Sequence, residues 1–379
     1  MATMLPAPGS GRMSLTAVLP GCLAALVGEG SEASLPPVDR AVVVLVDGLG
    51  SAALRARAGH ARNLVRDWRK RDLVDVGFPT TTAASITSFT TGVRAGEHGL
   101  VGYSALDPAG DRVLKLLSGW DARSVPEEWQ PVPTVFERAA AQGVAAFAVG
   151  PARYSGSGFS RAALRGATYV PAESMADRFA TTRALLDRTP RALVYLYVPE
   201  LDQAAHSHGW QSDRWLRELE ELDAAFGPFR ERLGAREGLL VTADHGIVDV
   251  PAESQVLFDR VPELVAGVRH VAGEPRCLHL HLEPGVDADA LADAWRASEG
   301  GRAHVATREE AVAADWYGGV RDGVGARIGD VIVAARALIA YYDGRPRDQG
   351  ARRMIGQHGS FSDEERLVPL IRAGAFARD

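Results

Sequence analysis

The sequence contains only two cysteines, Cys22 and Cys277, among its 379 residues. Two cysteines are too few for a disulfide framework. Neither lies in a Cys-x-x-Cys pair or in another spacing typical of a metal site. We therefore expect two ordinary thiols in a reducing cytoplasm.

Charge and hydropathy exclude further classes of protein. The net charge of −6 gives no reason to expect binding to a nucleic-acid polymer or to an anionic membrane. Lysine occurs only at Lys70 and Lys115, which we attribute to GC-rich coding because arginine supplies the other basic residues. We find no low-complexity block, no internal repeat and no apolar run of the about twenty residues that a membrane span needs. The chain is 46% hydrophobic and long enough for one large α/β domain with a smaller inserted one.

A mildly apolar stretch near the N-terminus, Leu15 to Val27, has two interpretations. It resembles the hydrophobic region of a signal peptide, and the letters LPGC at residues 19–22 resemble a lipoprotein cleavage site. The alternative is a short helix that begins at Pro20 and ends near Gly28. Its core-facing side would carry Leu23, Ala24 and Leu26. We favour the helix, because the apolar run is short and is interrupted by proline and glycine.

Short apolar runs alternate with helix-like segments along the first 250 residues. The β-branched run AVVVLV, Ala41 to Val46, is typical of a strand buried on both faces of a parallel sheet. A helix-like stretch runs from Ser51 to about Arg71, and a charged helical segment spans Asp213 to Leu233. Further strands are expected at Leu73 to Val76, Val144 to Val149, Ala192 to Val198 and Leu239 to Thr242. The alternation predicts an α/β fold with a mostly parallel central sheet flanked by helices.

The pattern changes after about residue 250. The segment RCLHLHLE, Arg276 to Glu283, alternates as a half-solvated strand does. A helix-like stretch, Ala288 to Ala297, and a strand-like piece, His304 to Thr307, follow it. We expect the run Asp330 to Ala334 to return to the main sheet. The chain would then consist of a main domain, residues 1–250 and 344–379, and a smaller inserted α+β lobe, residues 251–343.

Acidic residues follow three of the expected strands. Asp47 comes after AVVVLV, Asp202 comes shortly after ALVYLYV, and Asp244 comes after GLLVT. In open parallel sheets, ligands bind beyond the carboxyl ends of the strands. A single carboxylate at a strand end is commonplace and usually caps a helix. Three carboxylates on separate strands predict a convergent polar site.

Histidines accompany these carboxylates. Asp202 and His206 are four residues apart, so on a helix they would share a face and could bind one ion. His245 follows Asp244 directly, and His358 lies between glycines that let the backbone approach closely. Each residue alone could be a helix cap, a surface histidine or part of a turn, but their joint arrangement favours a metal site. Mixed nitrogen and oxygen ligands suit Zn²⁺, Mn²⁺ or Fe better than Mg²⁺ or Ca²⁺ alone.

A threonine-rich segment supplies hydroxyl groups. The letters FPTTTAAS at residues 78–85 lie between an expected strand and an expected helix. A hydroxyl at a helix N-terminus faces backbone N–H groups that suit a phosphate oxygen. The alternative is an ordinary N-cap in a threonine-rich turn. Coordination to a metal would lower the pKa of a hydroxyl that is otherwise a poor nucleophile.

Together these motifs resemble the alkaline phosphatase superfamily, in its nucleotide pyrophosphatase/phosphodiesterase branch. The matching pieces run from Val43 to His358: LVDG, FPTTTAASITSFTTG with EHG, ELDQAAHSHG, TADHG and GQHGS. The Pro-x-x-Thr motif of the branch implies that Thr82 is the nucleophile and forms a phospho-threonyl intermediate. The resemblance also implies two divalent ions, zinc or manganese, about 4 Å apart. The first would be held by Asp47, Thr82, Asp244 and His245, and the second by Asp202, His206 and His358.

Some positions depart from the pattern of the branch. Ala84 and Ser85 stand where the branch has Pro-Asn. Either Ser85 donates to a phosphate oxygen in place of the asparagine, or water fills the space. Ala95 replaces a common proline, which concerns only the loop. The Cys/Ser-x-Pro/Ala-x-Arg motif of sulfatases is missing, which argues against a sulfatase. His208 is off the four-residue spacing and is expected to be a turn residue or a neighbour of the ligands.

The letters TTTAAS and EHGLVGY are most similar to the cyclic di-AMP phosphodiesterases of high-GC bacteria. This resemblance implies a cytoplasmic enzyme that cleaves phosphodiester or pyrophosphate bonds of a nucleotide or cyclic dinucleotide. A phosphomonoesterase or phosphonate hydrolase is the enzymatic alternative, and a metal-binding scaffold protein is the non-enzymatic one. Residues 77–92 contain neither lysine nor arginine, which favours a singly charged diester over a monoester. Candidates to stack a base are Tyr103, chosen as a substrate-binding residue, and Tyr154, Phe159 and Trp210. The alternative, which we favour for at least two of the four, is ordinary packing in the core or at the rim.

Overall fold

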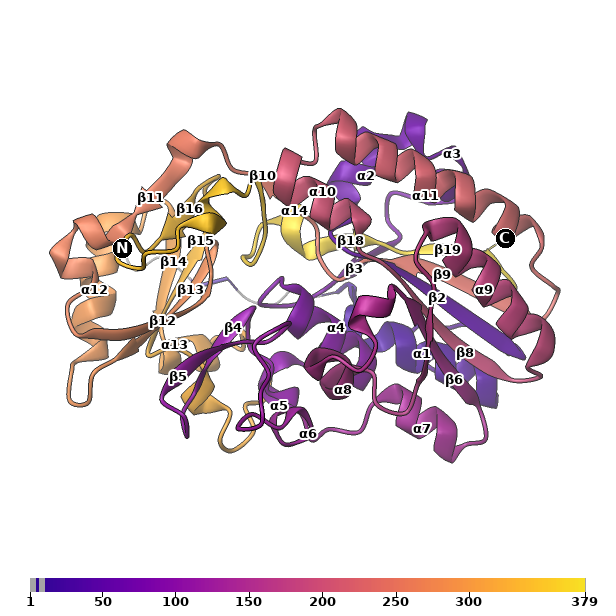
Figure 1. The fold of residues 1–379 in the computed structure, drawn as a ribbon, viewed down its shortest axis with the longest axis horizontal. Coiled ribbons are helices and arrows are strands. Elements are labelled where there is room, and N and C mark those ends of the chain that lie inside the picture. The colour runs from indigo at the N-terminus through magenta and orange to yellow at the C-terminus, as the bar shows by residue number, and fades with distance from the viewer. Residues whose placement is uncertain (1–4, 7–10, 379) are drawn as a thin grey trace.

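A six-stranded sheet forms the centre of the larger part of the molecule (Figure 1). The computed structural model describes residues 5–6 and 11–378. In the sheet, β2 (Arg40–Val46) pairs in parallel with β8 (Ala192–Val198) and β9 (Glu237–Thr242). The order β19-β9-β2-β8-β6-β7 is completed by β6 (Ala145–Gly150), β7 (Thr168–Pro171) and the antiparallel edge strand β19 (Ile371–Gly374). The expected α/β fold with a mostly parallel sheet is confirmed.

Helices cover both faces of this sheet (Figure 1). On one face lie α9 (Met175–Arg188) and α11 (Asp213–Glu231), which pack on each other. On the other lie α1 (Val18–Val27) and α7 (Val135–Ala141). The β-branched residues of β2 are buried against both layers, as a strand in the middle of a parallel sheet requires.

The N-terminal apolar stretch is the helix that we favoured. A 3-10 turn η1 (Leu15–Ala17) leads into α1, which therefore starts before Pro20. The helix ends at Gly28, whose φ of 78° is in the left-handed region. Leu23 and Leu26 are buried as expected, whereas Ala24 is only half-buried. None of the helices in the described ranges is long and apolar enough to cross a membrane.

The prediction of one long helix after β2 is wrong. The segment forms α2 (Ser51–Ala56), a 3-10 turn η2 (Ala58–His60) and the single turn α3 (Arg62–Val65). The carboxylate of Asp223 on α11 accepts hydrogen bonds from the backbone N–H of Leu64 at 2.8 Å and from that of Asn63 at 3.2 Å. This tertiary cap fixes the start of a new turn, and the sequence of the segment alone does not reveal it.

The strand before the threonine-rich segment lies outside the main sheet. β3 (Leu73–Asp75) pairs with β1 (Met13–Ser14) and with β18 (Leu367–Pro369) in a small three-stranded sheet. After β3 the chain passes through residues 76–81 into α4 (Thr82–Thr91), all of whose residues are buried. The small sheet therefore fixes the strand from which the chain enters α4.

A second, antiparallel sheet forms the other part of the molecule (Figure 1). Its order is β12 (Val268–Glu274), β13 (Cys277–Leu282), β15 (Val331–Ala335) and β14 (Ala303–Thr307), with α12 (Ala288–Glu299) packed on one face. The expectation that residues 330–334 return to the main sheet is wrong. β15 pairs with β13 and β14 instead. The prediction failed because the apolar pattern of this run fits a strand of either sheet equally well.

The half-solvated character expected for β13 is also wrong. Leu278 and Leu280 pack toward α12, and the other face carries His279 and His281, which are nearly inaccessible to solvent. The hydroxyl of Tyr317 lies 2.9 Å from Nε2 of His279 and covers that face. A period of two showed the two faces correctly, but it could not show that the polar face is covered.

The remaining elements connect these sheets. The hairpin β4 (Ser104–Asp107) and β5 (Arg112–Lys115) packs on the second sheet, and the pair β10 (Val248–Asp249) and β17 (Gly356–Gln357) brings the chain back beside α10 (Glu200–His208). β11 (Gln255–Leu257) pairs with β16 (Ala340–Tyr342). Short helices are α5 (Ala95–His98), α6 (Pro126–Trp129), α8 (Gly158–Ala163), α13 (Arg308–Ala313) and α14 (Asp363–Arg366). Further 3-10 turns are η3 (Ala152–Tyr154), η4 (Ala252–Ser254), η5 (Phe258–Arg260), η6 (Pro262–Leu264), η7 (Gly325–Arg327) and η8 (Gly350–Arg353).

Candidate active site

Asp47 follows the last residue of β2 and is 3% exposed. Its backbone N–H donates to the carbonyl of Val198 at 2.9 Å, and the hydroxyl of Tyr197 donates to its Oδ2. Gly48, with φ of 72°, lets the chain turn directly against Asp202, because a Cβ at this glycine would lie 3.1 Å from the Cβ of Asp202. The ends of β2 and β8 thus bring two carboxylates together.

Asp244 and His245 follow β9 and are fully buried. Oδ1 of Asp244 accepts hydrogen bonds from the backbone N–H of Gly48 at 3.3 Å and from that of His245 at 3.1 Å. Nε2 of His245 lies 3.3 Å from Oδ1 of Asp47 and 3.5 Å from Oδ2 of Asp244. Asp47, Asp244 and His245 therefore form one candidate metal-binding group.

Thr82 is the first residue of α4 and faces this group. Its Oγ1 lies 3.1 Å from Nε2 of His245. The preceding residue, Thr81, makes no side-chain cap to the helix within the described chain. The N–H groups of the first turn, beginning with that of Thr82, are therefore available to a ligand oxygen.

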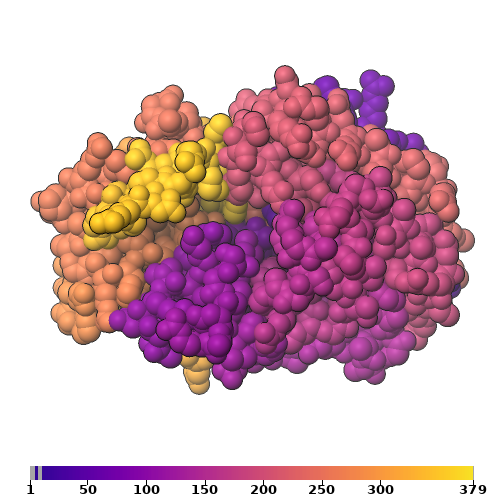
Figure 2. Space-filling model, viewed as in Figure 1, coloured from indigo at the N-terminus to yellow at the C-terminus, as the bar shows by residue number. Residues whose placement is uncertain are grey.

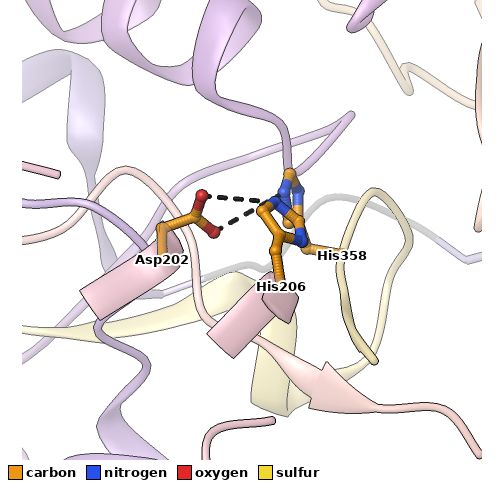
Figure 3. Close-up of side chains that lie close together, drawn as sticks. All are labelled: Asp202, His206 and His358. Carbon is orange, nitrogen blue, oxygen red and sulfur yellow. Dashed lines mark ion pairs between the residues drawn. The ribbon is translucent and has the colours of Figure 1, made fainter. Parts of the chain in front are cut away.

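Asp202, His206 and His358 form the second candidate group (Figure 3). Asp202 and His206 share one face of α10, with Nε2 of His206 at 3.2 Å from Oδ2 of Asp202. Nε2 of His358, from the segment after β17, lies 3.9 Å from Oδ1 of Asp202. The ring of His358 stacks on that of His245 with centroids 3.7 Å apart, so the two groups are contiguous. All seven residues expected at the site converge, and their roles as ligands and nucleophile stay predictions.

The hydrogen bonds of the three imidazoles define their tautomers. Nδ1 of His245 is 3.0 Å from the carbonyl of Gly246, Nδ1 of His206 is 2.8 Å from that of Gly356, and Nδ1 of His358 is 2.8 Å from that of Thr80. A ring nitrogen next to a carbonyl oxygen carries the proton, so in each neutral ring Nε2 keeps a lone pair. These lone pairs face carboxylate oxygens. Two acceptors that face each other need a cation between them, as in metal sites where a carbonyl orients the ligating histidine.

Three buried carboxylate oxygens of the two candidate groups also lack a hydrogen-bonding partner among the described residues. They are Oδ1 of Asp47, Oδ1 of Asp202 and Oδ2 of Asp244. Burial raises the pKa of Asp47 well above its usual value, and the nearby Asp244 and Asp202 raise it further. Burial also opposes ionisation of Asp202, but without a bound cation protonation of the adjacent histidines, His206 foremost, outweighs it and lowers the pKa of this carboxyl. The donor set fits divalent cations bound by mixed nitrogen and oxygen ligands.

A cavity of about 470 Å³ extends from these groups. Figure 2 shows the surface hollowed where the β4–β5 hairpin, the segments around α8 and the region after η8 meet. Tyr103, Tyr154 and Phe159 lie on its wall, as expected of residues that stack a base. Trp210 does not line this cavity and instead packs on Trp215, with ring centroids 6.2 Å apart.

Two further expected residues lie away from the cavity wall. Thr82 and Ile86 of α4 line it, but Ser85 does not. The hydroxyl of Ser85 is buried and has no hydrogen-bond partner among the described residues. Its role as a phosphate donor stays a prediction. His208 is exposed at the end of α10 and outside both candidate groups.

Three residues of the site were not predicted. Tyr197, which donates to Asp47, lies one residue before the end of β8 and could have been identified as a strand-end residue. Glu274 at the end of β12 is 8% exposed, and its Oε2 is 3.6 Å from Nδ1 of His358. Lys115 on β5 lines the cavity. Neither Glu274 nor Lys115 belongs to a motif, because both reach the site only through packing of the second sheet and its hairpin.

Sequence comparison identifies the family. The model of the type I phosphodiesterase / nucleotide pyrophosphatase family matches residues 41–361. The chain belongs to this family. The family is a branch of the alkaline phosphatase superfamily, as the motifs indicated. The family is metal-dependent, and the two groups described above are the candidate metal-binding groups of this member.

Individual relatives and solved structures share part of the sequence or the fold. A phosphopentomutase from Anaeromyxobacter dehalogenans is 33% identical over 137 residues, which span 36% of this chain and only 33% of the relative. Among solved structures, murine ectonucleotide pyrophosphatase / phosphodiesterase 5 has a TM-score of 0.70 at 18% identity, with 88% of each chain covered. Phosphonoacetate hydrolase from Sinorhizobium meliloti has a TM-score of 0.68 at 18% identity, covering 89% of this chain and 91% of that one. At such identity the likeness to the solved structures shows the fold alone.

Proposed function

We propose that this family member is a two-metal phosphodiesterase that cleaves nucleotide phosphodiester or pyrophosphate bonds, with cyclic di-AMP as its preferred substrate. The observation that carries the proposal is the position of Thr82. Its hydroxyl lies at the start of α4, beside His245, where both candidate metal groups meet a cavity of about 470 Å³. The proposed nucleophile, the candidate cation ligands and a cavity with room for a nucleotide thus lie together, which supports the proposal.

The proposed reaction divides hydrolysis into two displacements. The Thr82 hydroxyl loses its proton to solvent as Oγ1 bonds to phosphorus, and the phosphorus–oxygen bond on the opposite side breaks. Water then attacks the phospho-threonyl group, releases the product and restores the hydroxyl. The N–H groups at the start of α4 orient the phosphate oxygens. Divalent cations, when bound, supply Lewis acidity that lowers the pKa of the nucleophile and stabilises the leaving oxygen.

The cavity favours a nucleotide over a small phosphate ester. Tyr103, Tyr154 and Phe159 present aromatic rings, on which a base can stack. A related structure shows that the fold accommodates a nucleotide: an inactive threonine-to-alanine variant of the murine protein, in complex with AMP, has a TM-score of 0.69 at 18% identity. The motif resemblance to cyclic di-AMP phosphodiesterases makes that dinucleotide the first candidate. Zinc or manganese are the proposed ions, since the ligands mix imidazole and carboxylate.

A cytoplasmic location is part of the proposal. Cyclic di-AMP is made inside the cell, so an enzyme that degrades it acts there. Cys22 and Cys277 are both free and buried, which is compatible with a reducing compartment.

A substrate series tests the proposal. We expect kcat/KM of the metal-loaded protein to be higher for cyclic di-AMP and bis-p-nitrophenyl phosphate than for p-nitrophenyl phosphate. A clear preference for the monoester would contradict the diester proposal. Activity on bis-p-nitrophenyl phosphate without activity on cyclic di-AMP would contradict only the proposed dinucleotide.

Hydrolysis of a small phosphonate or a phosphomonoester is the second candidate. The observation that favours it is Lys115, which lines the cavity and supplies the positive charge that the motifs lack. The likeness in fold to phosphonoacetate hydrolase is compatible with it. The aromatic wall argues against it, because a small charged substrate has no use for that surface. Adding phosphonoacetate to the substrate series decides between the two.

A further inference from the structure

We propose that a second pocket, separate from the catalytic cavity, binds the phosphate group of a small phosphate ester. The pocket has a volume of about 490 Å³ and lies where β1, β3 and β19 approach one another. None of its residues lines the catalytic cavity. Its walls are formed by Gly11, Arg12, Met13, Glu32, Ala33, Ser34, Arg71, Asp72, Leu73, Leu370, Arg372 and Arg378.

Arg372 is the central observation. Among the described residues four arginines are buried, and three of them form ion pairs with a carboxylate: Arg178 with Glu200, Arg183 with Glu237, and Arg276 with Glu365. Arg372 is 8% exposed and has no such pair in the described chain. Its Nη2 donates to the carbonyl of Ala33 at 3.2 Å, and its Nε–H has no acceptor there.

A buried guanidinium without an anion is unfavourable. Burial lowers the pKa of Arg372, and the neighbouring Arg378 lowers it further. Arg378 is itself paired with Asp72, whose Oδ1 lies 2.8 Å from its Nη1. Asp72, the carboxylate whose charge acts on Arg372, is thus already paired, and Arg372 at the pocket wall has no ion-pair partner of its own in the described chain.

The net charge of the whole pocket also favours an anionic ligand. It contains four arginines and two acidic residues, Glu32 and Asp72, and so carries an excess of two positive charges. Residues 55–71, which precede β3 and end at Arg71 of the pocket, are also rich in arginine and add to the positive potential there. A phosphate monoester, with about two negative charges at neutral pH, matches this excess.

The size of the pocket indicates an ester rather than free phosphate. A volume of about 490 Å³ is typical of sites for small organic ligands and exceeds what one phosphate group fills. Leu73, Leu370 and the stem of Met13 provide apolar surface beside the arginines. The ligand class is therefore a phosphate monoester with a small, partly apolar or sugar-like body.

Hydrogen exchange of the metal-loaded protein tests this assignment with ribose 5-phosphate, inorganic phosphate and ribose as probes. We expect ribose 5-phosphate to protect residues 11–14, 70–73 and 370–374, inorganic phosphate to do so more weakly, and ribose to have no effect. Arg71→Gln should weaken the protection at least about fivefold in Kd. Arg123→Gln, at an exposed arginine outside the pocket, is the matched control.

Arg372→Met provides a second variant. Because it removes a buried charge without an anionic partner, we expect Tm in phosphate-free buffer to be unchanged or higher while protection by ribose 5-phosphate is lost. In both variants, the inhibition constant of inorganic phosphate for hydrolysis of bis-p-nitrophenyl phosphate should be the same as in the wild type, because the catalytic cavity is not altered. Protection confined to the catalytic cavity, or an unchanged Kd in both variants, would overturn the assignment.

Discussion

Oγ1 of Thr82 lies 3.1 Å from Nε2 of His245, at the junction of a helix N-terminus and two groups of buried ligands. His245 comes from the end of β9, and Thr82 starts α4 after a strand of a different sheet. The contact therefore depends on the docking of two sheets. It places the hydroxyl where a bound cation and the free N–H groups of α4 act on the same phosphate.

Thr82→Ala is expected to abolish turnover while most of the bound metal remains. The substitution removes the proposed nucleophile but none of the carboxylate or imidazole ligands. Steady-state kinetics with bis-p-nitrophenyl phosphate and metal analysis of the same sample check both parts. Residual activity above about 1% of wild type would contradict the role of Thr82.

The two preceding threonines are controls with different expected behaviour. Oγ1 of Thr80 donates to the carbonyl of Ser360 at 2.9 Å and accepts from the N–H of Gly359 at 3.0 Å. Thr80→Ala should therefore lower the free energy of unfolding by about 1–3 kcal/mol, because both backbone groups lose a buried partner. Thr81→Ala loses neither bond and should keep most of its activity. A dead Thr81→Ala variant would show that the nucleophile lies one residue earlier.

The part of the site formed by strand ends could be predicted from the sequence. Asp47, Asp202 and Asp244 follow three strands that pair in parallel, so their side chains had to meet at one edge of the sheet. Glu274 could not be predicted in this way. It ends a strand of the antiparallel sheet, and it reaches His358 because Gly359, with φ of 132°, has no side chain in the way.

The arrangement of the second sheet was harder to predict for a related reason. The run at residues 331–335 has the same apolar pattern whether it lies in the parallel or the antiparallel sheet. Its position is decided by partners distant in sequence: Val333 pairs with both Leu278 and Val305. Pairing between distant segments has no local signal, so strand existence could be predicted while sheet membership could not.

Asp202→Asn and Asp47→Asn should each reduce the metal content from about two ions per chain to about one. The two residues belong to different candidate groups, and each provides a buried carboxylate oxygen without another partner in the described chain. Mass-spectrometric metal analysis after dialysis measures the effect. Chelation of the wild type should also lower Tm, since an ion present at a hundred times its Kd stabilises the fold by about 2.7 kcal/mol. An unchanged metal content in both variants would contradict the assignment of the ligands.

Lys115→Gln is expected to lower kcat/KM for cyclic di-AMP by about tenfold and to change that for bis-p-nitrophenyl phosphate by less than about twofold. The ammonium lines the cavity and can contact a second phosphate, which only the dinucleotide has. Tenfold corresponds to about 1.4 kcal/mol. Lys70→Gln, at the other lysine of the chain and outside the cavity, is the control. Equal losses for both substrates would show that Lys115 supports the site without recognising the second phosphate.

His279 predicts a loss of stability in mild acid. Burial lowers the pKa of His279 to about 3, and the adjacent His281 contributes. In the unfolded chain a histidine has a pKa of about 6.5, so it takes up a proton there before it can in the folded state. The stability associated with neutral His279 is therefore complete above about pH 6.5 and falls as the pH decreases toward 3.

At pH 5 this histidine alone should reduce the free energy of unfolding by about 2 kcal/mol relative to pH 7. His279→Gln keeps an acceptor for the hydroxyl of Tyr317 but does not titrate, so it should make the pH dependence shallower by that amount. Urea unfolding at both pH values gives the result, with His208→Gln at an exposed position as the control. A pH dependence identical to that of the wild type would contradict this account.

The last prediction concerns the ion pair that joins the second sheet to the active site. Nε and Nη2 of Arg276, directly before β13, donate to the two carboxylate oxygens of Glu365 at 2.7 and 2.8 Å, and both side chains are almost completely buried. Glu365 also accepts from the N–H of Ser360 at 3.0 Å, and its backbone carbonyl accepts from the N–H of Gly246 at 2.7 Å. The pair thus supports the segments that carry His358 and His245.

Arg276→Met should lower the free energy of unfolding by about 3–5 kcal/mol, because it leaves the carboxylate of Glu365 buried without its cation. Adding Glu365→Leu should recover part of that loss, since no unpaired charge then remains, but it removes the bond to Ser360. We therefore expect the double variant to regain stability without regaining metal affinity or kcat. Guanidinium unfolding of both single variants and the double variant, with metal titrations, separates these effects. Additive losses of stability would show that the two side chains act independently, and full recovery of activity would show that the pair does not position the site.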